Sequence, residues 1–567
     1  MDNIRLFLVI ALVFISLLLY QAWQIDYGKK PSTTTDTTVT SEVSTPSTTT
    51  IAELPSTTSG EPPLAESSSR INAEFPESQP QRVLNSANRI QVETDLFRLE
   101  IDTQGGDIRR VDLLAYPIKA NTPEKSFRLM NDELPNVFIA QSGLQPAPTH
   151  EDVYHSAQSS YRLGSDDTLN VELTWQDTPT GISVKKIYTF QRGSYLIAVK
   201  HLVENKGQNP WQARVYGILQ RTHVAESGQS SFVYTYMGGA ISSPKSRYEK
   251  IKFTNMQDGD FNGEKREGWA HGWAAMLQHY FLGAWIPVPD EVFHYYTRVL
   301  PKGQRYVLGL YGQFVEIAPN SQHTFNLSFY AGPKVQDELA KIAPNLDLTV
   351  DYGWLWFIAQ PLFWLLEHIH TLTGNWGWAI IILTLLIKLA FFHLSATSYK
   401  SMANMRRIHP RLMALKERYG DDKARLNQAM MELYKKEKIN PLGGCLPILV
   451  QIPVFISLYW VLLESVELRQ AHFMFWLDDL STPDPYFVLP LIMAATMFLQ
   501  HKLNPAPIDP IQQKVMMMLP FIFGVFFAFF PSGLVLYWVV NNVLSITQQW
   551  IITKKIVGDS VVLRSKD

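Results

Sequence analysis

The chain has 567 residues, of which 46% are hydrophobic, 12% aromatic and 18% charged, and its formal net charge is −2. The charged share lies below the roughly 25% of an average soluble protein, and a polar part up to about residue 350 precedes a mostly apolar remainder. This pattern excludes a plain soluble globular protein and also one wholly buried in a membrane. The single cysteine, Cys445, excludes an intramolecular disulfide and a cysteine-based metal site.

The N-terminal segment predicts a membrane anchor followed by a tether. Residues 4–20 are apolar except for Arg5, and no small-residue cleavage site follows, so we expect an uncleaved transmembrane anchor over residues 1–22. Residues 31–60 contain 18 Ser or Thr, too polar a composition to offset the entropy of ordering. Residues 23–87 are therefore expected to be a disordered linker.

Residues 88–345 show the period-two alternation of β-strands. Val184–Phe190 and Tyr195–Val203 predict a hairpin joined by a four-residue connection, and Gly105-Gly106 predicts another turn. No sustained helical periodicity occurs before about residue 335. We therefore expect a single all-β sandwich of some 250 residues, since large all-β domains commonly reach that length.

The remainder predicts a helical membrane core. The short aromatic run Trp354–Leu366 is typical of an interfacial amphipathic helix, placed within residues 346–375. Five spans make up the rest of a core over residues 376–553: about 376–394, 443–463, 486–500, 515–530 and 533–552. With the N-terminal anchor this makes six transmembrane helices.

Charge predicts the orientation of these spans. The segment 395–442 carries eleven Lys or Arg against five acids, whereas Val466–Pro483 carries one Arg against three acids. Positive charge concentrates on the cytoplasmic side of membranes. The segment 395–442 and the basic tail 554–567 are therefore expected in the cytoplasm, as is the N-terminus, with the β domain outside.

Lys388 is the most informative residue, because it lies about 5 Å past the middle of an otherwise apolar span. A lysine at this depth costs a few kcal/mol unless it snorkels or faces a wet cavity. Snorkelling to the headgroups remains one interpretation. The other is a water-filled cavity open to one side, lined by polar residues of three spans: Thr384, Gln451, Asn541, Asn542, Ser545 and Gln548.

Residues 395–442 predict a cytoplasmic helical hairpin, with Gly420 at the end of its first helix and Asp421 or Asp422 capping the second. Its apolar residues either hold the two helices together or provide an adaptable docking surface. The candidate docking residues are Met402, Met405, Arg406, Arg407, Met430 and Met431.

Signals of catalysis and of cofactor binding are missing. Glu367-His368-x-His370 has its histidines two residues apart rather than the four of a zinc-protease helix, and Ser532 lacks a nucleophile-elbow context. No phosphate-binding loop or dinucleotide fingerprint occurs. We therefore expect no enzyme activity, no cofactor, no metal and no specific nucleic-acid site.

Three segments resemble the YidC family of membrane protein insertases: Gly420–Pro441 (GDDKARLNQAMMELYKKEKINP), Asn440–Phe473 (NPLGGCLPILVQIPVFISLYWVLLESVELRQAHF) and Phe530–Asn542 (FPSGLVLYWVVNN). The resemblance covers residues 376–552 most strongly. Anchor, external β domain and five-helix core together are similar to the Gram-negative branch, which implies an inner-membrane protein. The β domain is expected to be similar to sugar-epimerase sandwiches.

The resemblance implies a hydrophilic groove, open to the cytoplasm and to lipid, that holds one basic residue. That residue is usually arginine in this branch, and Lys388 stands at the matching position. The resemblance implies groove roles for Thr384, Gln451, Tyr537 and Trp538, and places Phe455, Met493 and Phe526 on an adjoining hydrophobic slide. Asn541 and Ser545 join the groove as polar residues of the last span.

The implied partners are nascent membrane proteins, the lipid bilayer, the Sec translocon with its accessory subunits, and a ribosome or signal recognition particle receptor. Two alternatives remain: a polytopic small-molecule transporter and a membrane-tethered sugar-processing protein. A transporter is expected to show paired broken helices in matching halves, and none is evident. In the β domain, His150, His155 and His223 have no spacing that ties them together.

Overall fold

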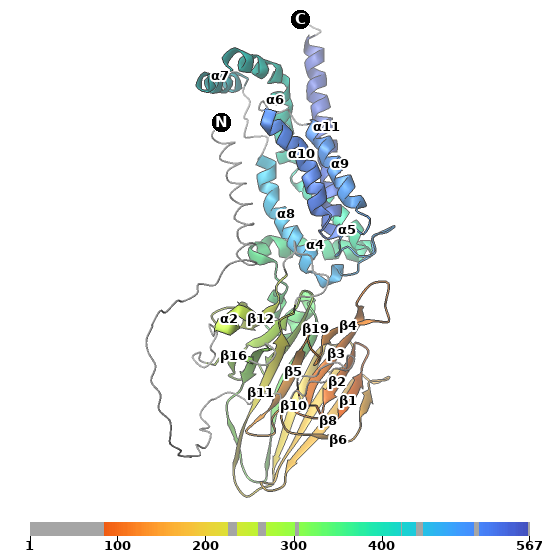
Figure 1. The fold of residues 1–567 in the computed structure, drawn as a ribbon, viewed down its shortest axis with the longest axis vertical. Helices are drawn as coiled ribbons and strands as arrows, with labels where there is room; N and C mark the ends of the chain where they lie inside the picture. Colours follow the sequence, from red (N-terminus) through yellow and green to blue (C-terminus); the bar gives the residue numbers. More distant parts are fainter. Residues whose placement is uncertain are drawn as a thin grey trace, which may run out of the picture. The chain divides into compact units, whose positions relative to one another are not determined.

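The computed structural model describes residues 84, 86–224, 235–258, 268–300, 305–420, 422–437, 446–503 and 510–564. The expected anchor at residues 1–22 and nearly all of the expected linker at 23–87 lie outside these ranges, as does Cys445. The described part begins with a β-rich region and continues into helices (Figure 1).

Two mainly antiparallel sheets form the β-rich region. The first has the order β16-β17-β11-β5-β3-β2-β1-β7, with β18 paired to β11 and β4 paired to β3. Its strands are β1 (Arg89–Glu93), β2 (Phe97–Asp102), β3 (Asp107–Pro117), β4 (Ser126–Met130), β5 (Phe138–Gln145), β7 (Ser160–Arg162), β11 (Trp211–Thr222), β16 (His294–Leu300), β17 (Arg305–Tyr311) and β18 (Val315–Ile317).

The second sheet has the order β13-β12-β14-β15-β19-β10-β9-β8-β6. Its strands are β6 (His155–Ser156), β8 (Thr168–Asp177), β9 (Ile182–Gln191), β10 (Leu196–Asn205), β12 (Gly238–Ser242), β13 (Glu249–Ile251), β14 (Trp273–Leu277), β15 (Phe281–Pro287) and β19 (Ser321–Pro333). Leu99 and Val111 of the first sheet share one buried core with Val199 and Trp285 of the second. The region is therefore a β-sandwich.

The hairpin predicted from alternation is confirmed. Strands β9 and β10 pair antiparallel with Phe190 opposite Ile197, and Gly193 adopts a φ of 70° in their connection. Gly105 and Gly106 likewise take positive φ in the turn between β2 and β3. Only glycine adopts this backbone conformation without a steric cost, so both turns could be predicted from local sequence.

The structure has a helix earlier than the periodicity indicated, because α2 (Phe253–Asp258) precedes residue 335. It spans six residues and buries Phe253 and Met256 against the sandwich. A helix of so few residues gives no repeating pattern that sequence reasoning could detect. The next helix, α3 (Gln336–Ile342), lies where helical sequence was expected.

The helical region follows α3 and begins with two short 3₁₀ turns. Its elements are η2 (Leu346–Thr349), η3 (Gly353–Leu355), α4 (Trp356–Thr373), α5 (Trp376–Ala390), α6 (Phe392–Tyr419), α7 (Lys423–Lys436), α8 (Leu446–Glu464), η5 (Val466–Leu468), α9 (Val488–Leu503), α10 (Pro510–Phe527) and α11 (Ser532–Arg564). Within the described ranges no helix by itself has both the length and the hydropathy to cross a membrane, but α5 and α6 meet both criteria as a pair bent by 68°.

The bend divides the expected span 376–394 between two helices. The Phe391 N–H still bonds to the Ile387 carbonyl at 3.1 Å, and Gln548 Nε2 on α11 donates to the Phe392 carbonyl at 3.2 Å. A polar side chain of a neighbouring helix can satisfy a backbone group near such a bend. One carbonyl at the break therefore accepts a hydrogen bond from a residue distant in the chain, a contact that the local sequence does not indicate.

Among the described residues, 408–420 and 422–437 form a compact unit separate from the rest, which contains the end of α6 together with α7. Asp422 Oδ1 accepts a hydrogen bond from the Arg425 N–H at 3.0 Å and so caps α7. Ile408 and Leu426 are buried, one on each helix. The two helices are further joined by an ion pair of 2.6 Å between the Arg411 guanidinium and the Glu437 carboxylate.

Candidate functional site

Lys388 lies near the end of α5 with only 7% of its surface exposed. Its Nζ donates a hydrogen bond of 2.7 Å to Ser545 Oγ on α11, the helix that packs against α5. A buried ammonium is tolerated only where polar groups replace part of its hydration. Ser545 supplies such a group, so the lysine is held within the helical core.

The start of α5 is fixed by its N-cap. The Asn375 carboxamide oxygen accepts from the N–H groups of Gly377 and Trp378, and its Nδ2 donates to the carbonyls of His472 and Phe473. The oxygen of this side chain therefore caps α5, and its nitrogen binds the segment before α9. The cap fixes the phase of the helix, which determines the face on which Lys388 lies.

Thr384 lies one turn before Lys388 and shares its helix face. Only 1% of its surface is exposed, and its hydroxyl donates to the Ile380 carbonyl at 2.6 Å. The threonine hydroxyl is therefore hydrogen-bonded within its own helix, and it makes no direct hydrogen bond to Lys388.

The last helix presents three predicted groove residues at four-residue spacing: Tyr537, Asn541 and Ser545. Ser545 Oγ lies 2.7 Å from the Asn541 carbonyl oxygen. On α8, the Phe455 ring lies 6.1 Å from the Tyr537 ring and 4.5 Å from the Trp538 ring, measured between centroids. These contacts bring residues of α8 and α11 together.

The remaining predicted groove and slide residues differ in exposure. Gln451, one turn before Phe455 on α8, is half-buried. Met493 of α9 is fully buried within the helical core, whereas 41% of the Phe526 surface on α10 is exposed. Phe526 packs its ring 4.7 Å from that of Phe530. Met493 therefore packs the interior, and Phe526 contributes to the apolar outer surface.

The predicted docking residues lie on α6 and α7. Arg406, Arg407 and Met431 are exposed, and the other three are half-buried: Met402, Met405 and Met430. Each helix therefore exposes a part of the predicted surface to solvent or to a partner.

One polar contact of α11 could not be predicted from the sequence. Asn542 Nδ2 donates to Thr496 Oγ1 at 3.2 Å and so joins α11 to α9. The polar character of Thr496 was visible in the sequence, but nothing there indicated that α9 would bring it to α11.

The sandwich interior contains charged groups that bear on the sugar-processing alternative. Lys186 is fully buried, and its Nζ donates to the carbonyls of Gly105 at 2.9 Å and Ser142 at 2.7 Å. Burial lowers the pKa of Lys186 to about 7 and raises the pKa of Asp107 to about 6. Asp107 pairs with Arg109 at 3.0 Å, and at most 1% of each of these three charged side chains is exposed. No substrate reaches groups that are closed off in this way.

The three histidines noted in the sequence do not form a catalytic group. His150 is buried with its Nδ1 2.8 Å from the Tyr216 hydroxyl, and burial lowers its pKa to about 3. His155 and His223 are exposed, and the His223 ring lies tilted beside the Phe253 ring at 4.8 Å between centroids. Across the residues that the structure describes, no three His, Cys, Asp or Glu side chains are placed to hold a metal ion.

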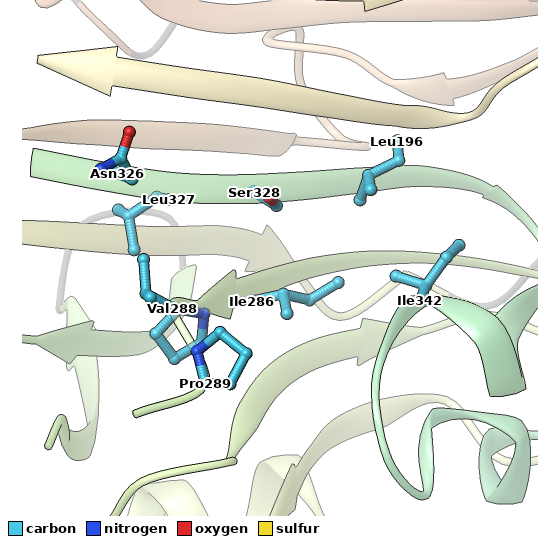
Figure 2. A pocket seen from close by; sticks show the side chains of 9 residues that line it. Leu196, Ile286, Val288, Pro289, Asn326, Leu327, Ser328 and Ile342 are labelled. Carbon is cyan, nitrogen blue, oxygen red and sulfur yellow. The ribbon is translucent and has the colours of Figure 1, made fainter. Parts of the chain in front are cut away.

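One small cavity of about 180 Å³ lies on the sandwich (Figure 2). Strands β15 and β19 supply most of its wall, and Ile342 of α3 closes one side. It is lined by Leu196, Ile286, Pro287, Val288, Pro289, Asn326, Leu327, Ser328 and Ile342. This lining includes no carboxylate and no histidine, so the cavity offers no acid or base for sugar chemistry.

Short apolar helices around a buried lysine, joined in one chain to a two-sheet sandwich, define the class of helical membrane proteins with a large extramembrane β domain. Residues 89–365 match the family described as YidC periplasmic domain, and residues 368–559 match the 60Kd inner membrane protein family. The chain is 49% identical to the membrane protein insertase YidC of Methylococcus capsulatus, over 98% of this chain and 99% of the relative.

A second relative, the membrane protein insertase YidC of Alkalilimnicola ehrlichii, is 51% identical over 98% of this chain and 96% of the relative. A solved structure titled "Active YidC insertase crystal structure with the first transmembrane domain resolved" covers 82% of this chain and 93% of its own, at 18% identity and a TM-score of 0.37. The chain belongs to the YidC family of membrane protein insertases and is an inner-membrane protein with a periplasmic domain.

Proposed function

We propose that this chain inserts and helps to fold integral membrane proteins by means of the positive charge of Lys388. The observation that carries the proposal is a buried ammonium in a helical core, held by a hydroxyl and paired with no carboxylate among the described residues. An intramembrane charge without an opposite partner attracts a carboxylate on a client segment. Membership of the insertase family supports this use of the charge.

The size of the attraction follows from Coulomb's law. At a separation of about 6 Å and an effective dielectric constant of about 20, a carboxylate and an ammonium attract each other by roughly 3 kcal/mol. That energy corresponds to roughly a hundredfold in rate if it acts fully in the transition state of insertion. The attraction therefore lowers the barrier for an acidic tail to enter the membrane.

The proposed arrangement includes five core helices, an N-terminal anchor and an interfacial helix at α4. Three tryptophans at or near α4 are 57–73% exposed: Trp354, Trp356 and Trp364. Their exposure supports contact of this helix with the membrane interface. We place the termini and the segment 395–442 in the cytoplasm on the basis of their basic residues. Lys388, Thr384, Gln451, Asn541 and their neighbours then line a groove open on the cytoplasmic side.

The proposed clients are nascent membrane proteins, which reach the chain directly or through the Sec translocon. The exposed basic residues Arg406 and Arg407 support docking of a ribosome or of a signal recognition particle receptor.

The test is insertion by the purified chain in liposomes. Clients are two single-span proteins that differ only in whether the translocated tail is acidic or neutral, and insertion is scored by protease protection. We expect Lys388→Arg to retain insertion of the acidic-tail client, Lys388→Met to reduce it and Lys388→Glu to reduce it further. The neutral-tail client serves as the control and should change little.

Equal insertion of the acidic-tail client by all four proteins would remove the role of the charge. Saturable uptake of a small solute by the same liposomes, without protection of either client, would favour the transporter alternative instead.

A further inference from the structure

The segment between η5 and α9 exposes large aromatic side chains. Phe475 is 80% exposed, Tyr486 68% and Phe487 51%. Trp476 is half-buried, and its ring stacks beside that of Phe475 with the centroids 6.0 Å apart. We call these four residues the loop aromatics. A cluster of exposed apolar rings marks a surface that contacts something other than water.

One buried carboxylate holds the loop aromatics together. Asp484 is 1% exposed, and its Oδ1 accepts from Trp476 Nε1 and from the Tyr486 N–H, each at 3.0 Å. Its Oδ2 accepts from the Leu489 N–H at 2.7 Å, in the first turn of α9. The aromatic residues before and after Asp484 therefore lie close together at the start of α9.

The rest of the segment is fixed to the helical core. Asp479 Oδ1 accepts from the N–H groups of Gln470 and Ser481 at 3.0 and 2.8 Å, which closes the loop on itself. Two N–H groups at the start of α11 donate to carbonyls of the loop, and the shorter bond joins Ser532 to Thr482 at 2.7 Å. The N-cap of α5 binds the same segment. Since α5, α9 and α11 all begin here, the segment lies across one end of the core.

Two of the exposed rings stand on a backbone conformation that bulky residues rarely adopt. Phe475 has a φ of 56° and Phe487 a φ of 57°, both in the left-handed region. A Cβ makes that region unfavourable, and it persists only where the surrounding contacts enforce it. Neither ring is buried in return. The chain therefore holds two apolar rings outside its own core at a conformational cost.

The neighbouring surface identifies what covers these rings. Leu491 and Ile492 of α9 follow Phe487 by about one turn and are 68% and 41% exposed. Because α9 is a short apolar helix of an inner-membrane protein, its exposed apolar side chains contact lipid. The loop aromatics continue this surface beyond the start of the helix. Aromatic rings concentrate at that level, between the acyl chains and water.

Polar groups beside the rings favour the headgroup region over the hydrocarbon. The side chains of His472 and Asp478 are 58% and 73% exposed, and His472 Nδ1 lies 3.1 Å from Asp478 Oδ1. Exposed groups of this kind are costly in hydrocarbon and are solvated among headgroups. A surface that combines apolar rings with exposed polar groups therefore fits the interface of a bilayer.

We propose that Phe475, Trp476, Tyr486 and Phe487 form an interfacial loop, which lies in the headgroup region of the periplasmic leaflet and fixes the depth of α9 in the bilayer. The inference goes beyond the insertion mechanism, because it requires no role of Lys388. Only the choice of leaflet rests on the proposed orientation of the chain.

The test measures depth with spin labels on the purified full chain in liposomes. In a Cys445→Ser background, a single cysteine replaces Phe475, Tyr486 or Phe487, so each label removes one ring and leaves the others. The controls are Asp167→Cys, at a side chain of the sandwich that is 95% exposed, and Val525→Cys, at a residue of α10 that is 69% exposed. Collision of the label with oxygen and with a water-soluble nickel complex reports its depth.

We expect the oxygen-to-nickel collision ratio at the three loop positions to lie roughly threefold or more above that at position 167 and roughly twofold or more below that at position 525. A ratio equal to that at position 167 would overturn the proposal. Shielding of the same labels in native membranes would then indicate a protein partner instead. A ratio equal to that at position 525 would also overturn it, because the rings would lie in hydrocarbon.

A second measurement asks whether the rings set the depth. Phe475→Ser and Phe487→Ser are combined with the label at position 486, where the collision ratio should fall by roughly twofold. The matched control Phe314→Ser removes a ring that is 52% exposed in the sandwich and should leave that ratio unchanged. If the two loop substitutions also leave it unchanged, the rings do not fix the depth and the inference is wrong.

The leaflet is tested separately with a membrane-impermeant thiol reagent on sealed vesicles. Asp478→Cys and Asp167→Cys, each in the Cys445→Ser background, should react from the same side, because the sandwich is periplasmic. Reaction from opposite sides would overturn the choice of leaflet and the proposed orientation with it. The depth of the loop and the role of Lys388 are measured independently, so each proposal fails by its own result.

Discussion

The start of α5 offers a sharp test of the packing that positions Lys388. Gly377 lies in the first turn of α5, and a Cβ built on it would come under 3.0 Å from the ring carbons of Phe473. That ring is 8% exposed and lies edge-on to the Trp378 ring at 5.8 Å. We therefore expect Gly377→Ala to displace Phe473.

The expected cost is the sum of three contributions. Inserting a methyl group into a packed site costs about 1–3 kcal/mol. Displacement of Phe473 also weakens the hydrogen bonds from Asn375 Nδ2 to the carbonyls of His472 and Phe473, worth roughly 1 kcal/mol each. Alanine regains at most about 1 kcal/mol of helix propensity over glycine. The net loss of stability is about 3 kcal/mol.

The assay is thermal unfolding of the purified chain in detergent, followed by tryptophan fluorescence. A loss of this size should lower the midpoint by roughly 6–12 °C, on the scale of a 150–250-residue domain. Insertion of both test clients should fall together, because the substitution disturbs the helix and not only its charge.

A double-mutant cycle with Phe473→Ala tests whether the loss of stability comes from the clash between the new methyl group and the Phe473 ring. Because removal of the ring makes room for the new methyl group, the double variant should lose less stability than the sum of the single variants. An unchanged midpoint for Gly377→Ala, or strict additivity in the cycle, would refute the steric argument.

Two further predictions concern the residues outside the membrane core. Burial and nearby carboxylates raise the pKa of Glu467 to about 7 from 4.5, so its contribution to stability is fully present below pH 4.5 and is lost as pH rises through 7. Glu467→Gln lacks that loss, so its advantage in free energy of unfolding should grow from pH 4.5 to 8. The expected gain is about 1–2 kcal/mol, after allowance for the partial exposure of this side chain. A difference independent of pH would contradict this. Trp285→Ala in the sandwich removes a ring that is 1% exposed and whose Nε1 donates to the Ile218 carbonyl, and should cost about 3–5 kcal/mol in thermal unfolding. The control Ile118→Ala, at a side chain 52% exposed, should change the midpoint little, and an equal effect of the two would count against core packing as the cause.

Local patterns determined much of the fold. The β9–β10 hairpin followed from alternating side chains and a glycine-containing connection, and the cap of α7 followed from an acidic residue after Gly420. These features depend on neighbours within a few residues, whose geometry is set by backbone sterics and by nearby hydrogen bonds. Hydropathy in the same way separated a β-rich part from a helical one.

The sequence by itself also determined that Lys388 lies within an apolar helix and requires a polar partner. It offered six polar candidates and no means to choose among them. The tertiary structure decided on Ser545, 157 residues away in the chain. It likewise enclosed Lys186 in the sandwich interior and ended α5 before Phe391. These outcomes depend on which surfaces pack together, and that is set by the fit of the whole chain rather than by the periodicity of one segment.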